Sequence, residues 1–141
     1  MADDALGPFV AEELRRLALP GAEITSTAEA GFHLFDYLLD VACLVVIDTI
    51  VTGTAAPGTI YSIGEGDLPS APGVAPHYIG LQEALVVARA LDLPAAKRLV
   101  VLAVEGADCL TFGGTMHPAV RAAIPLVVEE VKKLLENNCT N

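Results

Sequence analysis

The chain has 141 residues, of which 53% are hydrophobic, and its 18 acidic and 8 basic side chains give a formal net charge of -10. This length fits one domain with a substantial apolar core, and the abundance of Val, Leu, Ile and Ala excludes intrinsic disorder. The acidic balance argues against binding to nucleic acids or to anionic membranes, because few cations are present to neutralise phosphates.

The mean hydropathy of +0.54 is high, but no apolar stretch is long enough to cross a bilayer. The most continuous one, residues 41–47, is far shorter than the roughly 20 residues of a membrane helix. The first residues, Met-Ala-Asp-Asp, lack the basic and apolar regions of a signal peptide. Three scattered cysteines are too few for a disulfide framework or a zinc motif: Cys43, Cys109 and Cys139. We therefore expect a cytoplasmic protein.

Helical and strand patterns alternate along the chain. A first helix is predicted over residues 8–17, ending before Pro20-Gly21. Residues 22–27 are typical of a short strand, and apolar residues at helical spacing predict a second helix from about residue 30 to residue 41. The continuous β-prone run at 43–47 indicates a strand covered on both faces.

The second half of the chain continues this alternation. A strand is predicted over residues 59–63, and the Gly- and Pro-rich residues 64–76 are typical of a long loop. A helix over 80–91, a strand over 99–104 and a long helix over 118–136 follow. Helices between buried strands predict an α/β fold, a three-layer α/β/α sandwich with a twisted, largely parallel sheet.

Sites in such sheets lie at the carboxyl ends of the strands. Asp48 directly follows a predicted strand, and we expect the loop that ends at His77 to return over the same edge. Asp3 and Asp4 precede the first helix. The chain has no phosphate-binding loop, dinucleotide-binding glycine motif, HExxH or GxSxG. The candidates for catalysis or metal binding are therefore carboxylate and imidazole side chains.

Each candidate also has a purely structural interpretation. Asp3 or Asp4 would favour the positive end of the first helix, and Asp48 would organise a turn. A lone His is more often a structural hydrogen-bonding group than a ligand. Cys43 begins a buried strand, where a cysteine is usually a small inert hydrophobe. His117, beside Pro118, is either a helix cap or a substrate contact.

Four blocks, in order over nearly the whole chain, resemble the nickel–iron hydrogenase maturation endopeptidases. MADDALGP at 1–8 resembles the second half of the family's GNxLxxDDGxG signature. VIDTI at 46–50 and AAPGT at 55–59 resemble its strand ending in Asp and the hairpin that follows. PHYIGL at 76–81 is similar to its third block, a His opening a helix, and GGTMHPAV at 113–120 to the start of its last helix.

The resemblance implies one hydrogenase maturation protease domain over residues 1–141, with a phosphorylase/hydrolase-like fold. The sequence starts inside the first signature, without the strand that precedes it in the family. We therefore expect that strand to lie upstream of Met1. The alternative is a natural variant whose sheet lacks this strand.

The implied function is an endopeptidase that removes the C-terminal extension of a nickel–iron hydrogenase large-subunit precursor after nickel insertion. Matched residue by residue, Asp4, Asp48 and His77 would bind metal, and Asp4 and Asp48 would be catalytic. The metal would be nickel supplied by the substrate and used in recognition. The precursor is then the partner of a monomeric enzyme.

Two other functions fit the residues. The protein would be a non-cleaving module that binds the nickel-loaded large subunit, or a different peptidase on the related fold, such as the germination proteases of spores. A cleavage assay with purified components discriminates between cleavage and binding alone.

Overall fold

The computed structural model describes four segments of the chain: residues 5–27, 31–70, 75–107 and 116–137. Its three strands are β1 (Cys43–Ile50), β2 (Ile60–Gly64) and β3 (Arg98–Glu105). They form one sheet in the order β1-β3-β2, so that β3 lies in the middle. β1 runs parallel to β3, and β2 runs antiparallel to it.

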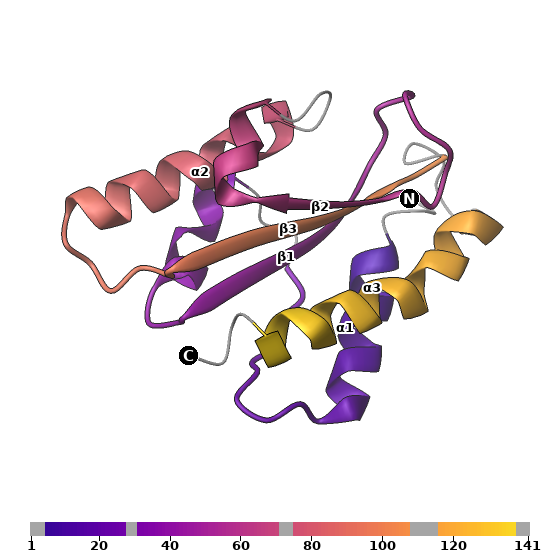
Figure 1. Cartoon of the computed structure of the whole chain (residues 1–141), viewed down its shortest axis with the longest axis horizontal. Coiled ribbons are helices and arrows are strands. Elements are labelled where there is room, and N and C mark those ends of the chain that lie inside the picture. Colours follow the sequence, from indigo (N-terminus) through magenta and orange to yellow (C-terminus); the bar gives the residue numbers. More distant parts are fainter. Residues whose placement is uncertain (1–4, 28–30, 71–74, 108–115, 138–141) are drawn as a thin grey trace.

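Helices cover both faces of this sheet (Figure 1). On one face lie α1 (Leu6–Leu17) and α3 (Pro118–Asn137); on the other lie α2 (Ala75–Ala90) and the 3-10 helix η2 (Gly31–Leu38). A second 3-10 helix, η3 (Glu65–Ser70), follows β2. The predicted three-layer α/β/α sandwich is confirmed. None of the described helices is both long and apolar enough to cross a membrane.

The central strand β3 separates two apolar cores. Its odd-numbered residues from Leu99 to Ala103 pack under α2 and η2, and its even-numbered residues from Val100 to Val104 pack under α1 and α3. Successive side chains of a strand point to opposite faces, so a strand buried on both faces reads as a continuous apolar run. This is why the sequence predicts β3 almost to the residue.

The strand predicted over residues 22–27 is wrong. Ile24 packs against the core beside α1, but its neighbours Glu23 and Thr25 are exposed, and this stretch has no strand structure. The carbonyl of Ile24 instead accepts a hydrogen bond from Nη2 of Arg15 at 3.4 Å. The alternating pattern is present, but a strand also needs a neighbouring strand for its backbone groups.

The loop predicted over residues 64–76 is also largely wrong. Gly64 ends β2, η3 follows directly, and α2 begins at Ala75 instead of residue 80. Pro76, counted in the sequence as a loop residue, occupies the first turn of α2. A proline is tolerated there because the first N–H groups of a helix have no partner within it.

Cys43, the first residue of β1, is disulfide-bonded. The expectation of an inert hydrophobic cysteine at this position is therefore wrong. Its side chain is only partly buried, because β1 is an outer strand of the described sheet. Cys109 and Cys139 lie outside the described residues.

Candidate active site

Asp48 lies within β1, two residues before its end, and not directly after the strand as predicted. The strand continues because Thr49 and Ile50 are buried and pair with Val104 and Glu105 of β3. The backbone of Asp48 is thereby held in the sheet, while its side chain is exposed. An exposed carboxylate on a fixed strand is well suited to bind or polarise a substrate.

Two hydrogen bonds orient the Asp48 carboxylate. The Tyr78 hydroxyl donates to Oδ2 at 3.1 Å, and the Thr49 backbone N–H donates to Oδ1 at 2.9 Å. Tyr78 is buried, and burial together with the charge of Asp48 and this hydrogen bond raises the pKa of the phenol well above its usual value of 10.0. The hydroxyl therefore stays protonated and remains a donor. Sequence reasoning missed Tyr78, although it is the residue after His77.

The first turns of two helices approach this part of β1. Tyr78 lies in the first turn of α2, so its hydroxyl links Asp48 to the start of the helix that also contains His77. At the start of α1, a Cβ added to Gly7 would be 3.7 Å from the carbonyl oxygen of Ile47. The start of α1 thus lies against Ile47, and Tyr78 at the start of α2 binds Asp48.

The predicted metal trio itself is only partly within the described residues. Asp4 lies outside them, and for His77 the structure describes the backbone but not the side chain. Among the side chains that are described, no group of three His, Cys, Asp or Glu residues is arranged to hold a metal ion. The shared role of Asp4, Asp48 and His77 therefore stays a prediction.

Glu105, the last residue of β3, is a buried carboxylate that the sequence analysis missed; its exposed fraction is 1%. Oε2 accepts the backbone N–H groups of Thr52 at 2.7 Å and Gly53 at 3.4 Å. Oε1 accepts the hydroxyls of Thr52 and, at 2.8 Å, of Tyr61. Burial alone would raise the pKa of Glu105, but these hydrogen bonds outweigh it and hold the pKa below the usual value of 4.5. The group is therefore an anion at neutral pH.

Asp48 and Glu105 lie on the same face of the sheet, the face that α2 covers. Asp48 pairs with Ala103, two residues before Glu105, so the two carboxylates project in adjacent rows of neighbouring strands. Tyr61 pairs with Ala103 from the other side. Carboxylates and tyrosine hydroxyls thus form a polar layer near the carboxyl ends of the two parallel strands, where α/β sheets place their sites.

His117 caps the first turn of α3. Its Nδ1 accepts the backbone N–H of Ala119 at 3.1 Å, and its carbonyl oxygen accepts the N–H of Arg121 at 2.9 Å. These contacts satisfy N–H groups that have no partner within the helix. Of the two interpretations of His117, the structure supports the cap.

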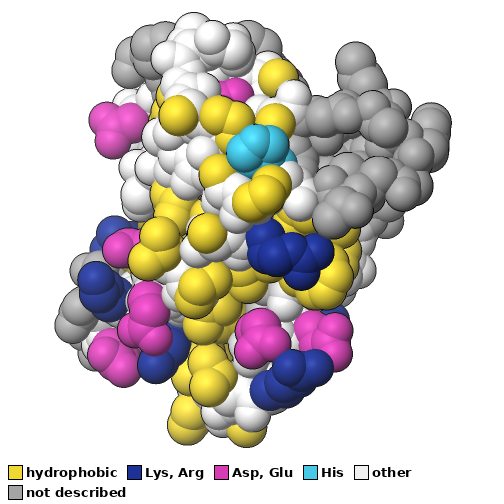
Figure 2. All heavy atoms as spheres, turned by 90° about the vertical axis from the view of Figure 1, so that its right-hand side faces the viewer, with side chains coloured by type: hydrophobic (Ala, Val, Ile, Leu, Met, Phe, Trp, Pro, Cys, Tyr) yellow, Lys and Arg dark blue, Asp and Glu magenta, His cyan; other side chains and the backbone are white. Residues whose placement is uncertain are grey.

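Figure 2 views the end of the molecule where β1 and β3 finish. Apolar side chains make up much of this face, and one histidine is surrounded by them. Most of the charged side chains in this view lie in its lower half, but a basic side chain lies just below that histidine and acidic side chains are also present in the upper half.

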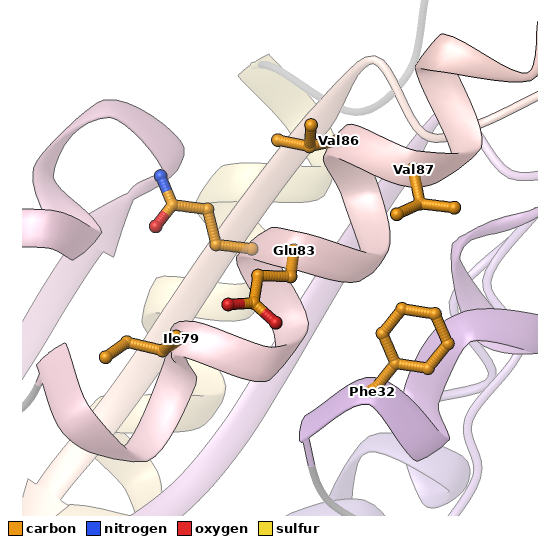
Figure 3. Close-up of a pocket in the computed structure, with 6 residues that line it drawn as sticks. Phe32, Ile79, Glu83, Val86 and Val87 are labelled. Atoms are coloured by element: carbon orange, nitrogen blue, oxygen red, sulfur yellow. The ribbon is translucent and has the colours of Figure 1, made fainter.

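A separate groove of about 380 Å³ lies on the outer side of α2 (Figure 3). Its six lining residues are mostly apolar: Phe32, Ile79, Gln82, Glu83, Val86 and Val87. The side of α2 that packs on the sheet carries Tyr78, Leu81 and Leu85 instead. Asp48 is therefore reached from the opposite side of α2, and this groove is not part of the carboxylate layer.

Comparison with known proteins places this arrangement in a family. The hydrogenase maturation protease family model matches residues 8–134, which include Asp48, His77 and Glu105. The hydrogenase 2 maturation protease of Escherichia coli K12 is 28% identical over 143 residues, covering 98% of this chain and 85% of the relative. The structure of the hydrogenase maturating endopeptidase HybD from E. coli matches with a TM-score of 0.76 and 25% identity, covering 98% of this chain and 87% of that one.

Other relatives are longer. The hydrogenase expression/formation protein HupD of Thiocapsa roseopersicina is 28% identical over 134 residues, which are 91% of this chain but 59% of the relative. The chain likewise spans 60% of HupM from Azotobacter chroococcum and 65% of HupD from Rhodobacter capsulatus. Because the family model covers most of the sequence, the chain belongs to the hydrogenase maturation protease family.

Proposed function

We propose that the protein is an endopeptidase that removes the C-terminal extension of a nickel–iron hydrogenase large-subunit precursor once nickel has been inserted. Family membership supports this function, as does similarity to a relative named hydrogenase 2 maturation protease. The observation that carries the proposal is the exposed Asp48 carboxylate, held by Thr49 and by Tyr78, the residue that follows His77 in the first turn of α2.

In this proposal Asp4, Asp48 and His77 bind the nickel of the precursor, so the metal enters as part of the substrate. Two carboxylates and one imidazole suit a divalent metal of this class. Each oxygen of Asp48 accepts one of the two hydrogen bonds described, and a carboxylate oxygen has a second lone pair for a ligand. Tyr78 and Thr49 therefore orient the group, and each of these two hydrogen bonds uses only one lone pair of the oxygen that accepts it.

The chemistry follows from the same residues. Nickel, when bound, would polarise the scissile carbonyl or activate water. Asp4 and Asp48 are the proposed catalytic residues, because a carboxylate can take up a proton from an attacking water. Three protein ligands would leave coordination positions for groups of the precursor, so only nickel-loaded precursor would be positioned. We further propose that the enzyme acts as a cytoplasmic monomer.

The test is cleavage of purified precursor, followed by mass spectrometry of the released extension. Asp48→Asn keeps an oxygen acceptor for Tyr78 and should lower the rate at least about 100-fold while leaving the thermal midpoint nearly unchanged, because an exposed side chain contributes little to packing. His77→Gln should have the same effects. Asp92→Asn, at an exposed residue just after the C-terminal end of α2, should cleave normally.

Nickel-loaded and nickel-free precursor are compared in the same assay. Equal processing of the two would refute the role of nickel in recognition. Tight binding of nickel-loaded precursor without any cleavage would instead support the alternative function, a non-cleaving binding module.

A further inference from the structure

Both ends of the loop from β1 to β2, residues 51–59, bind the same residue, Glu105. Because β3 lies between these two strands, the loop must cross the end of β3, where Glu105 is the last residue. The Glu105 side chain binds the beginning of the loop at Thr52 and Gly53. Its backbone binds the end of the loop: the N–H of Gly58 donates to its carbonyl oxygen at 2.7 Å, and its own N–H donates to the carbonyl oxygen of Thr59 at 2.8 Å.

The carboxylate is matched to a set of donors. Two backbone N–H groups and two hydroxyls point to its oxygens, and no ion pair between Glu105 and a described cation is present. A carboxylate only accepts hydrogen bonds, whereas an amide would direct its own N–H groups at some of these donors. A buried charge that is balanced by neutral dipoles is stabilised by each donor that stays in place. The loop and Glu105 therefore order one another.

The same contacts extend to Asp48. Ile50, two residues after Asp48, pairs with Glu105, and its carbonyl oxygen accepts the N–H of Gly106 at 2.7 Å. The next contact along the chain is Thr52 with the Glu105 carboxylate. The end of β1 and the start of the loop thus contact the end of β3 at successive residues that follow the candidate catalytic residue in the chain.

We infer that Glu105 is a positioning residue, which through its carboxylate keeps the loop 51–59 as a preformed wall beside Asp48 before the precursor arrives. The inference rests on the proposed function, since the wall serves substrate binding at Asp48. A preformed loop spares the substrate the ordering of that loop, which improves affinity. Loss of the carboxylate should therefore appear mainly in KM, with kcat changed less.

The experiment compares Glu105→Gln with Tyr61→Phe, its matched control. Tyr61 donates to the same carboxylate from β2 and not from the loop, so its loss weakens the cluster without removing a loop contact. Amide hydrogen exchange of Thr52 and Gly53 is measured in the full chain without substrate, and KM and kcat are measured with nickel-loaded precursor.

We expect Glu105→Gln to accelerate exchange of both amides about 10- to 100-fold, the range for losing hydrogen bonds to a charged group, and to raise KM roughly tenfold. Tyr61→Phe should leave exchange and KM close to those of the unchanged chain, even where its thermal midpoint falls equally. Thr52→Val, which keeps the carboxylate, should change amide exchange and KM in the same direction but by less. This variant tests the inference if Glu105→Gln does not fold.

Equal exchange and equal KM in Glu105→Gln and Tyr61→Phe would overturn the inference, because a merely structural carboxylate predicts this result. If no form of the chain cleaves the precursor, the proposed function fails on its own. The exchange comparison then still decides whether Glu105 orders the loop.

Discussion

Gly58 lies directly against the carbonyl group of Ala119, so closely that a Cβ on Gly58 would be 2.5 Å from the Ala119 oxygen. This contact joins the loop 51–59 to the first turn of α3. Gly58 also has a φ of +90°, a backbone conformation that side chains disfavour. Two blocks that are 60 residues apart in the sequence, around Gly58 and around Pro118, thus meet in the structure.

Gly58→Ala should therefore destabilise the protein by about 3 kcal/mol or more, as the strain of a positive φ is added to a clash with backbone. Gly21→Ala is the matched control, because Gly21 has a φ of +73° but no atom within 4 Å of an added Cβ. It should destabilise by only about 1 kcal/mol. Urea unfolding measures both, and equal losses would mean that α3 moves aside without strain.

Tyr78→Phe tests how far the orientation of Asp48 matters. The variant removes the hydroxyl that donates to Oδ2 of Asp48 and keeps the buried ring. We expect a loss of stability of about 1 kcal/mol and a roughly tenfold fall in kcat for precursor cleavage, as for one hydrogen bond to a charged group. Tyr37→Phe, at a partly buried tyrosine of η2, should change neither quantity. Unaltered kcat in Tyr78→Phe would show that Asp48 needs no such orientation.

The fold could be predicted because β3 and the helices keep strong hydrophobic periodicity. The wrong elements have local causes. Prolines around the start of α2 make its first five residues look like a loop in the sequence. Residues 22–27 alternate like a strand but have no neighbouring strand. The sequence also cannot say that β3, and not β2, lies next to β1, since this pairing depends on tertiary contacts.

The same limit explains which site residues were found. Asp48 was recognised because it follows an apolar run, and Glu105 ends another such run, so the same rule applied to β3 would have found it. Its partners, however, lie 53 and 44 positions away, at Thr52 and Tyr61. Only the sheet order brings these residues together. Tyr78 was hidden by the late predicted start of α2, which left its position relative to β1 undefined.

Arg89 provides a test of the contact between α2 and its neighbours. Its guanidinium binds both carboxylate oxygens of Glu65 in η3 and the carbonyl oxygen of Ala96 at 3.2 Å. The ion pair is partly exposed, so Arg89→Ala should destabilise by about 1 kcal/mol. Arg16→Ala, which breaks more exposed pairs within α1, should change stability by less than about 0.5 kcal/mol. Thermal unfolding of both variants at low salt checks the difference.

The last prediction concerns acid. The pKa of Glu105 in the folded protein lies below its usual value of 4.5, so between those two pKa values the unfolded chain binds a proton that the folded chain does not. Stability from this group is therefore fully present above about pH 4.5 and is lost as the pH falls through the folded pKa. Glu105→Gln has no such proton to bind. The variant should be less stable than the unchanged chain at pH 7, and the gap between them should narrow on acidification.

Urea unfolding of the two proteins from pH 7 down to about pH 3 measures this gap, and subtracting one curve from the other cancels the contribution of the remaining acidic residues. Tyr61→Phe is measured in parallel. The difference in stability between Tyr61→Phe and Glu105→Gln should also narrow on acidification, but by less, because only Thr52 and Gly53 still donate to the carboxylate. A gap that stays constant over the whole range would mean that Glu105 titrates alike in both states. Its hydrogen bonds would then do no more than offset its burial.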